Sequence, residues 1–202
     1  MVTGDTRATF GGSVMVDFDV DTEVAEALLA DPSAPRRLLD VITAPAFSEE
    51  AVDLLARKRG KCRLLANPAL RALGADALDR GPRWRQVRGG RVEQPNYTFV
   101  LDLSHPDVQI IGALSNVQAR DLLLAWGTGS TSNSNTTTLV RAGQLLGNGV
   151  GQQDRVGGCA LAIRRSLDAG HQPAGCVVRM TSSFGPTVMP WIPANDATVA
   201  YS

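Results

Sequence analysis

The sequence has no excess of charge of either sign and no long run of apolar residues. Lys and Arg together number 20, as do Asp and Glu, so no net field attracts nucleic acid or an anionic membrane. No apolar run approaches the roughly 20 residues of a membrane span, and the N-terminus lacks the basic-then-apolar pattern of an export signal. These absences predict a soluble, cytoplasmic protein with neither nucleic-acid nor membrane partners.

Side chains that bind metals or perform nucleophilic catalysis are also scarce. The chain has two histidines, and its three cysteines, Cys62, Cys159 and Cys176, are widely separated and form no Cys-x-x-Cys pair. This odd number suits a reducing compartment better than a disulfide scaffold, and we expect no metal site. Neither His105 nor His171 has a serine or cysteine partner in a recognisable nucleophile motif, so nothing supports that kind of catalysis.

What the sequence does contain is an alternation of strand and helix patterns. Its 202 residues, 44% of them apolar, suffice for one large domain or two small ones. Polar caps predict the starts of four helices, at Asp21, Ser48, Ser115 and Asp154. Strands are predicted over residues 13–18, 38–45, 62–66, 136–140 and 144–149, and on both sides of Gly89-Gly90. The alternation favours an α/β fold of layered sheets and helices.

Three of the predicted helices have further features that the structure can test. The helix after Ser48 is predicted to close with residues 57–59 and to end at Gly60. The predicted apolar face of the helix after Ser115 consists of Val117, Leu122, Leu123 and Trp126. The predicted apolar face of the helix from Asp154 to Leu167 consists of Val156, Ala160, Ile163 and Leu167.

Polar side chains and glycines concentrate in residues 131–158, TSNSNTTTLVRAGQLLGNGVGQQDRVGG. Three glycines at alternate positions, 147, 149 and 151, leave one backbone edge without side chains, so a planar or charged ligand could approach closely. The helix that begins near Asp154 would direct free N–H groups at an anion, and Arg155 would add a planar fork. Nearby amides that can recognise a heterocycle belong to Asn133, Asn135, Gln152 and Gln153. A phosphorylated heterocycle is therefore a candidate ligand.

An ordinary structural role can explain the same residues. Glycine-rich turns between a hairpin and a helix are common, and polar side chains at a helix start usually face water. The spacing is not the Rossmann fingerprint, since no glycine follows three residues after Gly151, and the missing lysine excludes a P-loop. Asp40, inside an apolar strand, needs a partner, a ligand or exposure to solvent. Phe10-Gly11-Gly12 alone reads as a simple turn.

Three ordered stretches resemble one protein family. LLLAWGTGSTSNSNTTTLVRAGQLLGNGVGQQDRVGG, residues 122–158, is similar to the C-terminal half of AICAR transformylase (phosphoribosylaminoimidazolecarboxamide formyltransferase). TFGGSVMVDFDVDTEVAEAL, residues 9–28, resembles that family's Phe-Gly-Gly strand and following helix. LLDVITAPAFSEEAVDLLARKRGKCRLL, residues 38–65, resembles its Ala-Pro strand with the next helix and strand. The resemblance extends from Thr9 to about Gly175.

The resemblance implies a cytidine-deaminase-like three-layer α/β sandwich with a mixed sheet, and a homodimer. It also implies that a formyl group passes from 10-formyltetrahydrofolate, the co-substrate, to AICAR in purine synthesis. Carried over by position, the residues that would contact the nucleotide are Phe10, Gly11, Asp40, Asn135 and Arg155. The amide of Gln152 would join them, and Val156 would lie beside the folate.

The chain also departs from the family pattern. We treat residues 1–202 as one transformylase-like domain and expect the family's Lys-His pair upstream of it and its Phe-Phe-Pro-Phe folate segment downstream, because neither occurs within it. Residues 176–199 resemble an insertion. The general base is therefore unidentified, and two functions stay open: a formyltransferase in partial or shortened form, and a non-catalytic nucleotide-binding module. A deaminase is excluded by the lack of zinc ligands.

Overall fold

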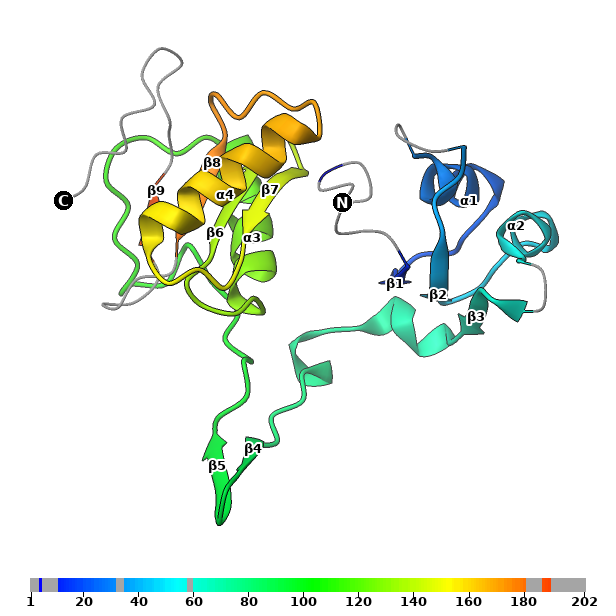
Figure 1. The fold of residues 1–202 in the computed structure, drawn as a ribbon, viewed down its shortest axis with the longest axis horizontal. Helices are drawn as coiled ribbons and strands as arrows, with labels where there is room; N and C mark the ends of the chain where they lie inside the picture. Colours follow the sequence, from blue (N-terminus) through cyan, green and yellow to red (C-terminus); the bar gives the residue numbers. More distant parts are fainter. Residues whose placement is uncertain (1–3, 5–10, 32–34, 58–59, 181–186, 190–202) are drawn as a thin grey trace. The chain divides into compact units, whose positions relative to one another are not determined.

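The computed structural model describes residues 4, 11–31, 35–57, 60–180 and 187–189 of the chain. The contacts divide the chain into two compact units, formed mainly by residues 6–78 and by residues 79–202 (Figure 1). Both units combine strands with helices, which confirms the predicted α/β class. None of the helices in the described ranges is long and apolar enough to cross a membrane.

The first unit is built from three parallel strands with a helix after each of the first two. Parallel pairing gives the order β1-β2-β3. The elements are β1 (Gly12–Met15), α1 (Thr22–Leu29), β2 (Leu39–Ala44), α2 (Glu49–Leu55) and β3 (Arg63–Ala66). The predicted caps are confirmed, since the Asp21 carboxylate accepts a hydrogen bond from Val24 N and the Ser48 hydroxyl accepts one from Ala51 N.

Two predicted boundaries in this unit are wrong. The first strand ends at Met15 rather than at Phe18, because the chain bends away from the sheet and carries Asp19 to an ion pair with Arg71. Helix α2 ends at Leu55 rather than near residues 57–59, because Ala56 takes an extended ψ of 134° and Arg57 turns back to bind the start of β2.

The core of the first unit lies on one face of its sheet. Ala25 and Leu28 of α1 and Ala51 and Leu55 of α2 pack together with Ile42 of the central strand. Both helices therefore cover the same face. The other face is open in this unit: Met15, Thr43 and Leu65 lie side by side in register, and the Met15 and Leu65 side chains are exposed.

Short elements follow β3. They include two 3₁₀ turns, η2 (Pro68–Ala72) and η3 (Ala75–Ala77). The hairpin predicted around Gly89-Gly90 is confirmed as β4 (Arg83–Val87) paired with β5 (Gly90–Gln94). All residues of these two strands are exposed.

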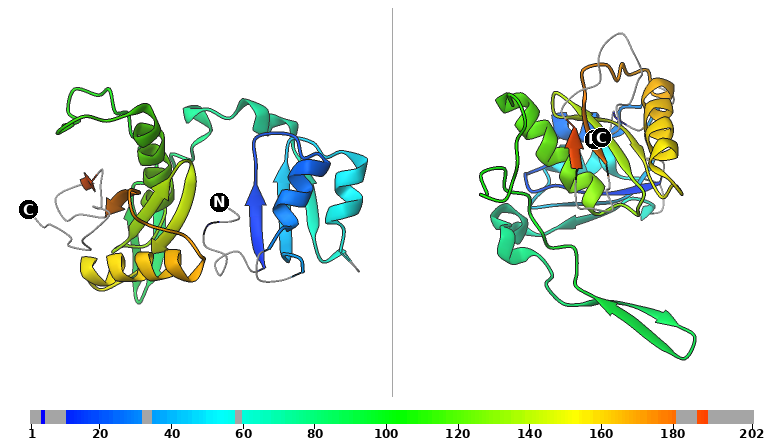
Figure 2. Two further views of the ribbon diagram at one scale, coloured as in Figure 1. Left: turned by 90° about the horizontal axis from the view of Figure 1, so that it is seen from above. Right: turned by 90° about the vertical axis from the view of Figure 1, so that its left-hand side faces the viewer.

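The second unit is centred on a four-stranded antiparallel sheet with the order β7-β6-β8-β9. Helices α3 and α4 cover its opposite faces (Figure 2, left). The elements are α3 (Asn116–Ser130), β6 (Thr137–Arg141), β7 (Gln144–Gly149), α4 (Arg155–Asp168), β8 (Val177–Met180) and β9 (Thr187–Met189). The predicted hairpin and the caps at Ser115 and Asp154 are confirmed.

The predicted apolar faces of both helices are right only in part. Leu122 of α3 is buried and the half-buried Ile163 of α4 packs against the core, but none of the other predicted residues is buried. Helix α3 continues past Gly127 to Ser130, and its Val117 and Leu123 side chains are exposed. The buried residues of α3 are Asp121, Leu122, Ala125 and Gly129. On α4, Val156, Ala160 and Leu167 are exposed. The buried residues of α4 are Gly158, Cys159, Ala162 and Ser166. Small residues replace large apolar ones on this face because the helix backbone packs directly on β7.

Asp121 fixes the orientation of α3. This carboxylate is 3% exposed, and its two oxygens accept hydrogen bonds from Ala142 N at 2.8 Å and Gly143 N at 2.7 Å. The two residues form the β6–β7 turn and have positive φ angles of 50° and 75°. A buried carboxylate needs such donors, so α3 must turn its Asp121 side toward the sheet.

Candidate functional site

Asn135 and Gln152 join the two ends of the segment that the sequence singled out. Asn135 N donates to Gln152 O, and Gln152 N donates to Asn135 O, each at 3.1 Å. The Asn135 side chain adds two bonds, from Nδ2 to Gln152 O and to Gln153 O, both at 3.0 Å. Asn135 and Gln152, both predicted to bind the substrate, are therefore neighbours, and Gln152 lies three residues before Arg155 in the chain.

These bonds restrict what the two amides can offer a ligand. Both Nδ2 hydrogens of Asn135 are used within the loop, which leaves Oδ1 as its available atom because no described residue donates to it. Gln152 Nε2 donates to Val150 O at 3.1 Å and so keeps one further hydrogen. A ligand at this loop would therefore meet one acceptor from Asn135 and a donor and an acceptor from Gln152.

Gly147 and Gly149 do not lie open to a ligand. A Cβ atom on Gly147 would lie 2.2 Å from Ala162 O, and one on Gly149 would lie 2.0 Å from Gly158 O. The interpretation of these two glycines as a bare edge for ligand approach is therefore wrong, because the backbone of α4 occupies the space. Gly151 differs, since nothing lies within 4 Å of its Cβ position and its φ is +68°.

The start of α4 brings Arg155 and Val156 next to this loop. Arg155 is half-buried at the first helical position, and Val156 is 59% exposed. Asp154 caps the helix by accepting from Gly157 N at 2.7 Å. The Asp154 carboxylate already occupies the positive end of the α4 dipole. An anion at this place would therefore be attracted more strongly by the Arg155 guanidinium than by the helix end.

Gly11 and Asp40 form a second group, in the other unit. The Cβ position of Gly11 lies 3.3 Å from Asp40 Oδ2, and Gly11 has a φ of +65°. Asp40 is exposed to solvent although β2 is the central strand of its sheet. This exposure is one of the three conditions that the sequence allowed for a carboxylate inside an apolar strand. It also has a partner that the sequence did not reveal: Arg57 Nη1 donates to Asp40 Oδ1 at 3.1 Å and to Leu39 O at 3.0 Å. Phe10 lies outside the described residues.

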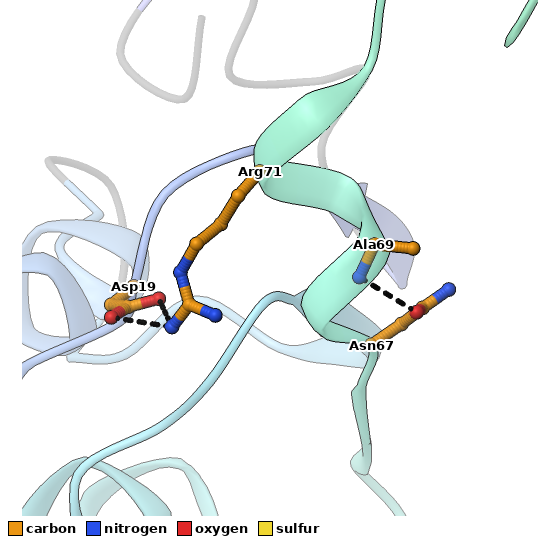
Figure 3. Close-up of polar contacts among 4 residues, drawn as sticks. All are labelled: Asp19, Asn67, Ala69 and Arg71. Atoms are coloured by element: carbon orange, nitrogen blue, oxygen red, sulfur yellow. Dashed lines mark hydrogen bonds and ion pairs between the residues drawn. The ribbon is translucent and has the colours of Figure 1, made fainter.

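The carboxyl end of the parallel sheet, where ligands often bind in α/β folds, contains an ion pair instead. Arg71 Nη2 contacts Asp19 Oδ1 at 2.6 Å and Oδ2 at 2.8 Å, and so joins the segments that follow β1 and β3 (Figure 3). Asn67 begins the 3₁₀ turn that bears Arg71 by accepting from Ala69 N at 3.1 Å. The charges of Arg71 and Asp19 neutralise each other.

The sequence reading missed Arg57, Arg71 and Asp121. The first two lie 17 and 52 residues from their acidic partners, and no local pattern links them. Asp121 did carry a signal, because a carboxylate interrupts the apolar run of α3. Among the residues that the structure describes, no group of three or more His, Cys, Asp or Glu side chains could hold a metal ion.

Comparison with known proteins identifies the family. The family model described as the AICARFT/IMPCHase bienzyme matches residues 1–165. The bifunctional purine biosynthesis protein PurH of Caulobacter vibrioides is 30% identical over 180 residues, which are 89% of this chain and 32% of that protein. PurH of Cutibacterium acnes is 30% identical over 192 residues, covering 92% and 34%, and PurH of a Synechococcus strain is 32% identical over 183 residues, covering 90% and 32%.

The chain thus spans about a third of the length of the curated relatives that it matches. The family match covers the Phe-Gly-Gly strand, the Ala-Pro strand and the loop from Asn135 to Arg155. The chain belongs to the AICARFT/IMPCHase bienzyme family of purine biosynthesis.

Proposed function

We propose that the chain binds the AICAR nucleotide as part of a formyltransferase that uses 10-formyltetrahydrofolate. The observation that carries this proposal is the pairing of Asn135 with Gln152, which lies three residues before Arg155. It sets amide groups and a guanidinium close together in the stretch of sequence that most resembles the family. Amides suit the carboxamide of AICAR, and a guanidinium suits its phosphate.

The remaining assignments follow from the same proposal. The exposed Val156 side chain would contact the folate co-substrate. By the resemblance, Phe10, Gly11 and Asp40 would contact the nucleotide. The Arg57–Asp40 ion pair would hold that carboxylate in place. Arg57 would then be a positioning residue, since it acts through Asp40.

Positioning does not complete the reaction. The amine of AICAR is a poor nucleophile, because its lone pair is delocalised toward the carboxamide. When its nitrogen attacks the formyl carbon, a base must take the amine proton and the folate nitrogen must leave. No Lys-His pair occurs in residues 1–202, so we propose that the polypeptide of these residues binds AICAR without measurable formyl transfer.

A non-catalytic nucleotide-binding module is the second candidate. A spectroscopic assay of tetrahydrofolate release, with a full-length PurH relative as the positive control, tests the absence of turnover that both candidates predict for these residues. Binding without turnover is expected for the 202-residue chain. Turnover at a rate typical of enzymes would mean that another residue supplies the base, and failure to bind AICAR at all would refute both candidates.

The fold and assembly proposed for the whole protein are a cytidine-deaminase-like three-layer sandwich with a mixed sheet and a cytoplasmic homodimer. The support is the open face of the parallel sheet. Parallel sheets are ordinarily covered on both faces, yet Met15 and Leu65 are exposed there. Light scattering across micromolar concentrations should show association of the chain. A strictly monomeric, compact species would contradict the dimer.

A further inference from the structure

A second polar cluster lies beneath α3, on the face of the four-stranded sheet opposite α4. Thr138 of β6 pairs in register with Asn148 of β7 on one side and with Arg179 of β8 on the other. Residues paired in this way point to the same face of a sheet. Three neighbouring strands therefore contribute polar side chains at one level, and the last turns of α3, with Trp126 and Gly129, lie over them.

Thr138 and Asn148 belong to a hydrogen-bond chain that ends at a backbone carbonyl of α3. Thr138 Oγ1 donates to Asn148 Oδ1 at 2.9 Å, and Asn148 Nδ2 donates to Ser132 Oγ at 3.2 Å. Ser132 Oγ in turn donates to Thr128 O near the end of α3 at 2.9 Å. This chain does not include Arg179.

Among the residues that the structure describes, no anion pairs with the buried cation of Arg179. The residue is 5% exposed, and its Nε and Nη1 atoms, like Nε1 of Trp126, have no hydrogen-bond partner in the described part of the chain. Its Cζ atom lies 5.3 Å from the centroid of the Trp126 ring. A cation–π contact returns only about 2 kcal/mol, which is less than the several kcal/mol that burial of a charge costs. Burial accordingly lowers the pKa of Arg179.

The surroundings are shaped to admit this guanidinium. A Cβ atom on Gly129 would lie 2.6 Å from Arg179 Nη1, so only glycine leaves the room. The Trp126 ring over the guanidinium is half-buried, and the ring that meets its edge, at a centroid distance of 5.6 Å, belongs to the exposed Phe99. The cation is therefore one side-chain layer from solvent.

We infer that Arg179 and Trp126 form a binding site for the carboxylate of a small molecule, separate from the proposed AICAR loop. Nε and Nη1 of Arg179 and the indole N–H of Trp126 lack partners in the described part of the chain, and a carboxylate can accept from either guanidinium nitrogen together with the indole. The negative end of the α3 dipole lies beside Gly129, so a singly charged anion fits better than a phosphate dianion.

Acetate is the probe, and the tryptophan fluorescence of the intact 202-residue chain is the readout. A saturable change on addition of sodium acetate is expected, with sodium chloride at equal ionic strength as the reference. Arg179→Met keeps the length and the apolar contact of the side chain but removes its charge, and should weaken acetate binding about tenfold or more. Arg63→Met, which removes an exposed arginine from β3, is the matched control and should bind as the wild type does.

Two further variants keep the inference open to refutation if Arg179→Met fails to fold. Trp126→Phe retains a ring but loses the N–H, and should weaken acetate binding by a factor of about 2 to 10. Titration calorimetry measures this variant and the wild type, because the substitution removes the fluorescent reporter at the site. Arg179→Lys should bind acetate more weakly than the wild type, because the point charge lacks the guanidinium geometry. No saturable response in the wild type, unchanged affinity in these variants, or tighter binding of phosphate than of acetate would overturn the assignment. AICAR binding is measured in a separate titration, so the acetate result and the AICAR result are independent of each other.

Discussion

Replacement of Gly149 by alanine should separate a packing role of the glycine-rich strand from a ligand-binding role. The added Cβ atom would lie 2.0 Å from Gly158 O and 2.9 Å from Ala162 N, both of which are backbone atoms of α4. A backbone cannot swing aside as a side chain can, so the helix itself must move away from β7. Overpacking of a core typically costs about 1–3 kcal/mol, and we expect Gly149→Ala to lie at or above the upper end.

Gly127→Ala is the matched control on the neighbouring helix. Gly127 is an exposed residue inside α3, with nothing within 4 Å of its Cβ position and no positive φ. Alanine in a helix interior is favoured over glycine, so this variant should gain about 0.5–1 kcal/mol. The two variants make the same chemical change and are expected to differ in the sign of its effect.

Urea denaturation followed by tryptophan fluorescence gives both free energies of unfolding. The three tryptophans, Trp84, Trp126 and Trp191, all belong to the second unit, so the signal reports the unit that contains β7 and α4. Wild-type stability in Gly149→Ala would refute the packing explanation. If that stable variant also lost AICAR binding, the open-edge interpretation of the glycines would be restored.

Three further outcomes are expected. Asp121→Ala should lower the free energy of unfolding by about 2–4 kcal/mol in the same urea assay, because two backbone donors lose a buried acceptor; a change within about 0.5 kcal/mol would contradict this. Cys176 should react slowly with a thiol reagent at about pH 8 until urea is added, because burial raises the pKa of its thiol to about 11. Because the pKa is raised in the folded state, the contribution of the Cys176 thiol to stability is complete below the unfolded value of 9.0 and is lost as pH rises through about 11. A pH series of urea denaturation curves that compares the wild type with Cys176→Ala would test this loss at high pH.

The sequence predicted those features of the fold that are determined locally. All four helix caps were found from the sequence, because a cap depends on a side chain and a backbone N–H only three residues away. The β6–β7 hairpin was found for a similar reason, since Ala142 and Gly143 make a tight turn between two apolar runs. These signals need no knowledge of the remainder of the chain.

Features that depend on tertiary partners were not predicted. The buried face of α4 is made of Gly158, Ala162 and other small residues, and it becomes the packing face only because β7 has glycines opposite it. The sequence did bring Asn135 and Gln152 together, since both belong to one short segment. It could not pair Arg57 with Asp40 or bury Arg179 against Trp126, because those contacts require the folded sheets.

Titration calorimetry of AICAR with the 202-residue chain and with Arg155→Ala tests the central claim most directly. A guanidinium that binds the phosphate contributes charge-assisted hydrogen bonds, so its loss should weaken binding by a factor of about 10 to 100, with partial recovery in Arg155→Lys. Arg164→Ala, which removes an exposed arginine from the same helix, should leave the affinity unchanged. Equal affinity of the wild type and a folded Arg155→Ala would contradict the account and reduce the loop to an ordinary connection between a hairpin and a helix.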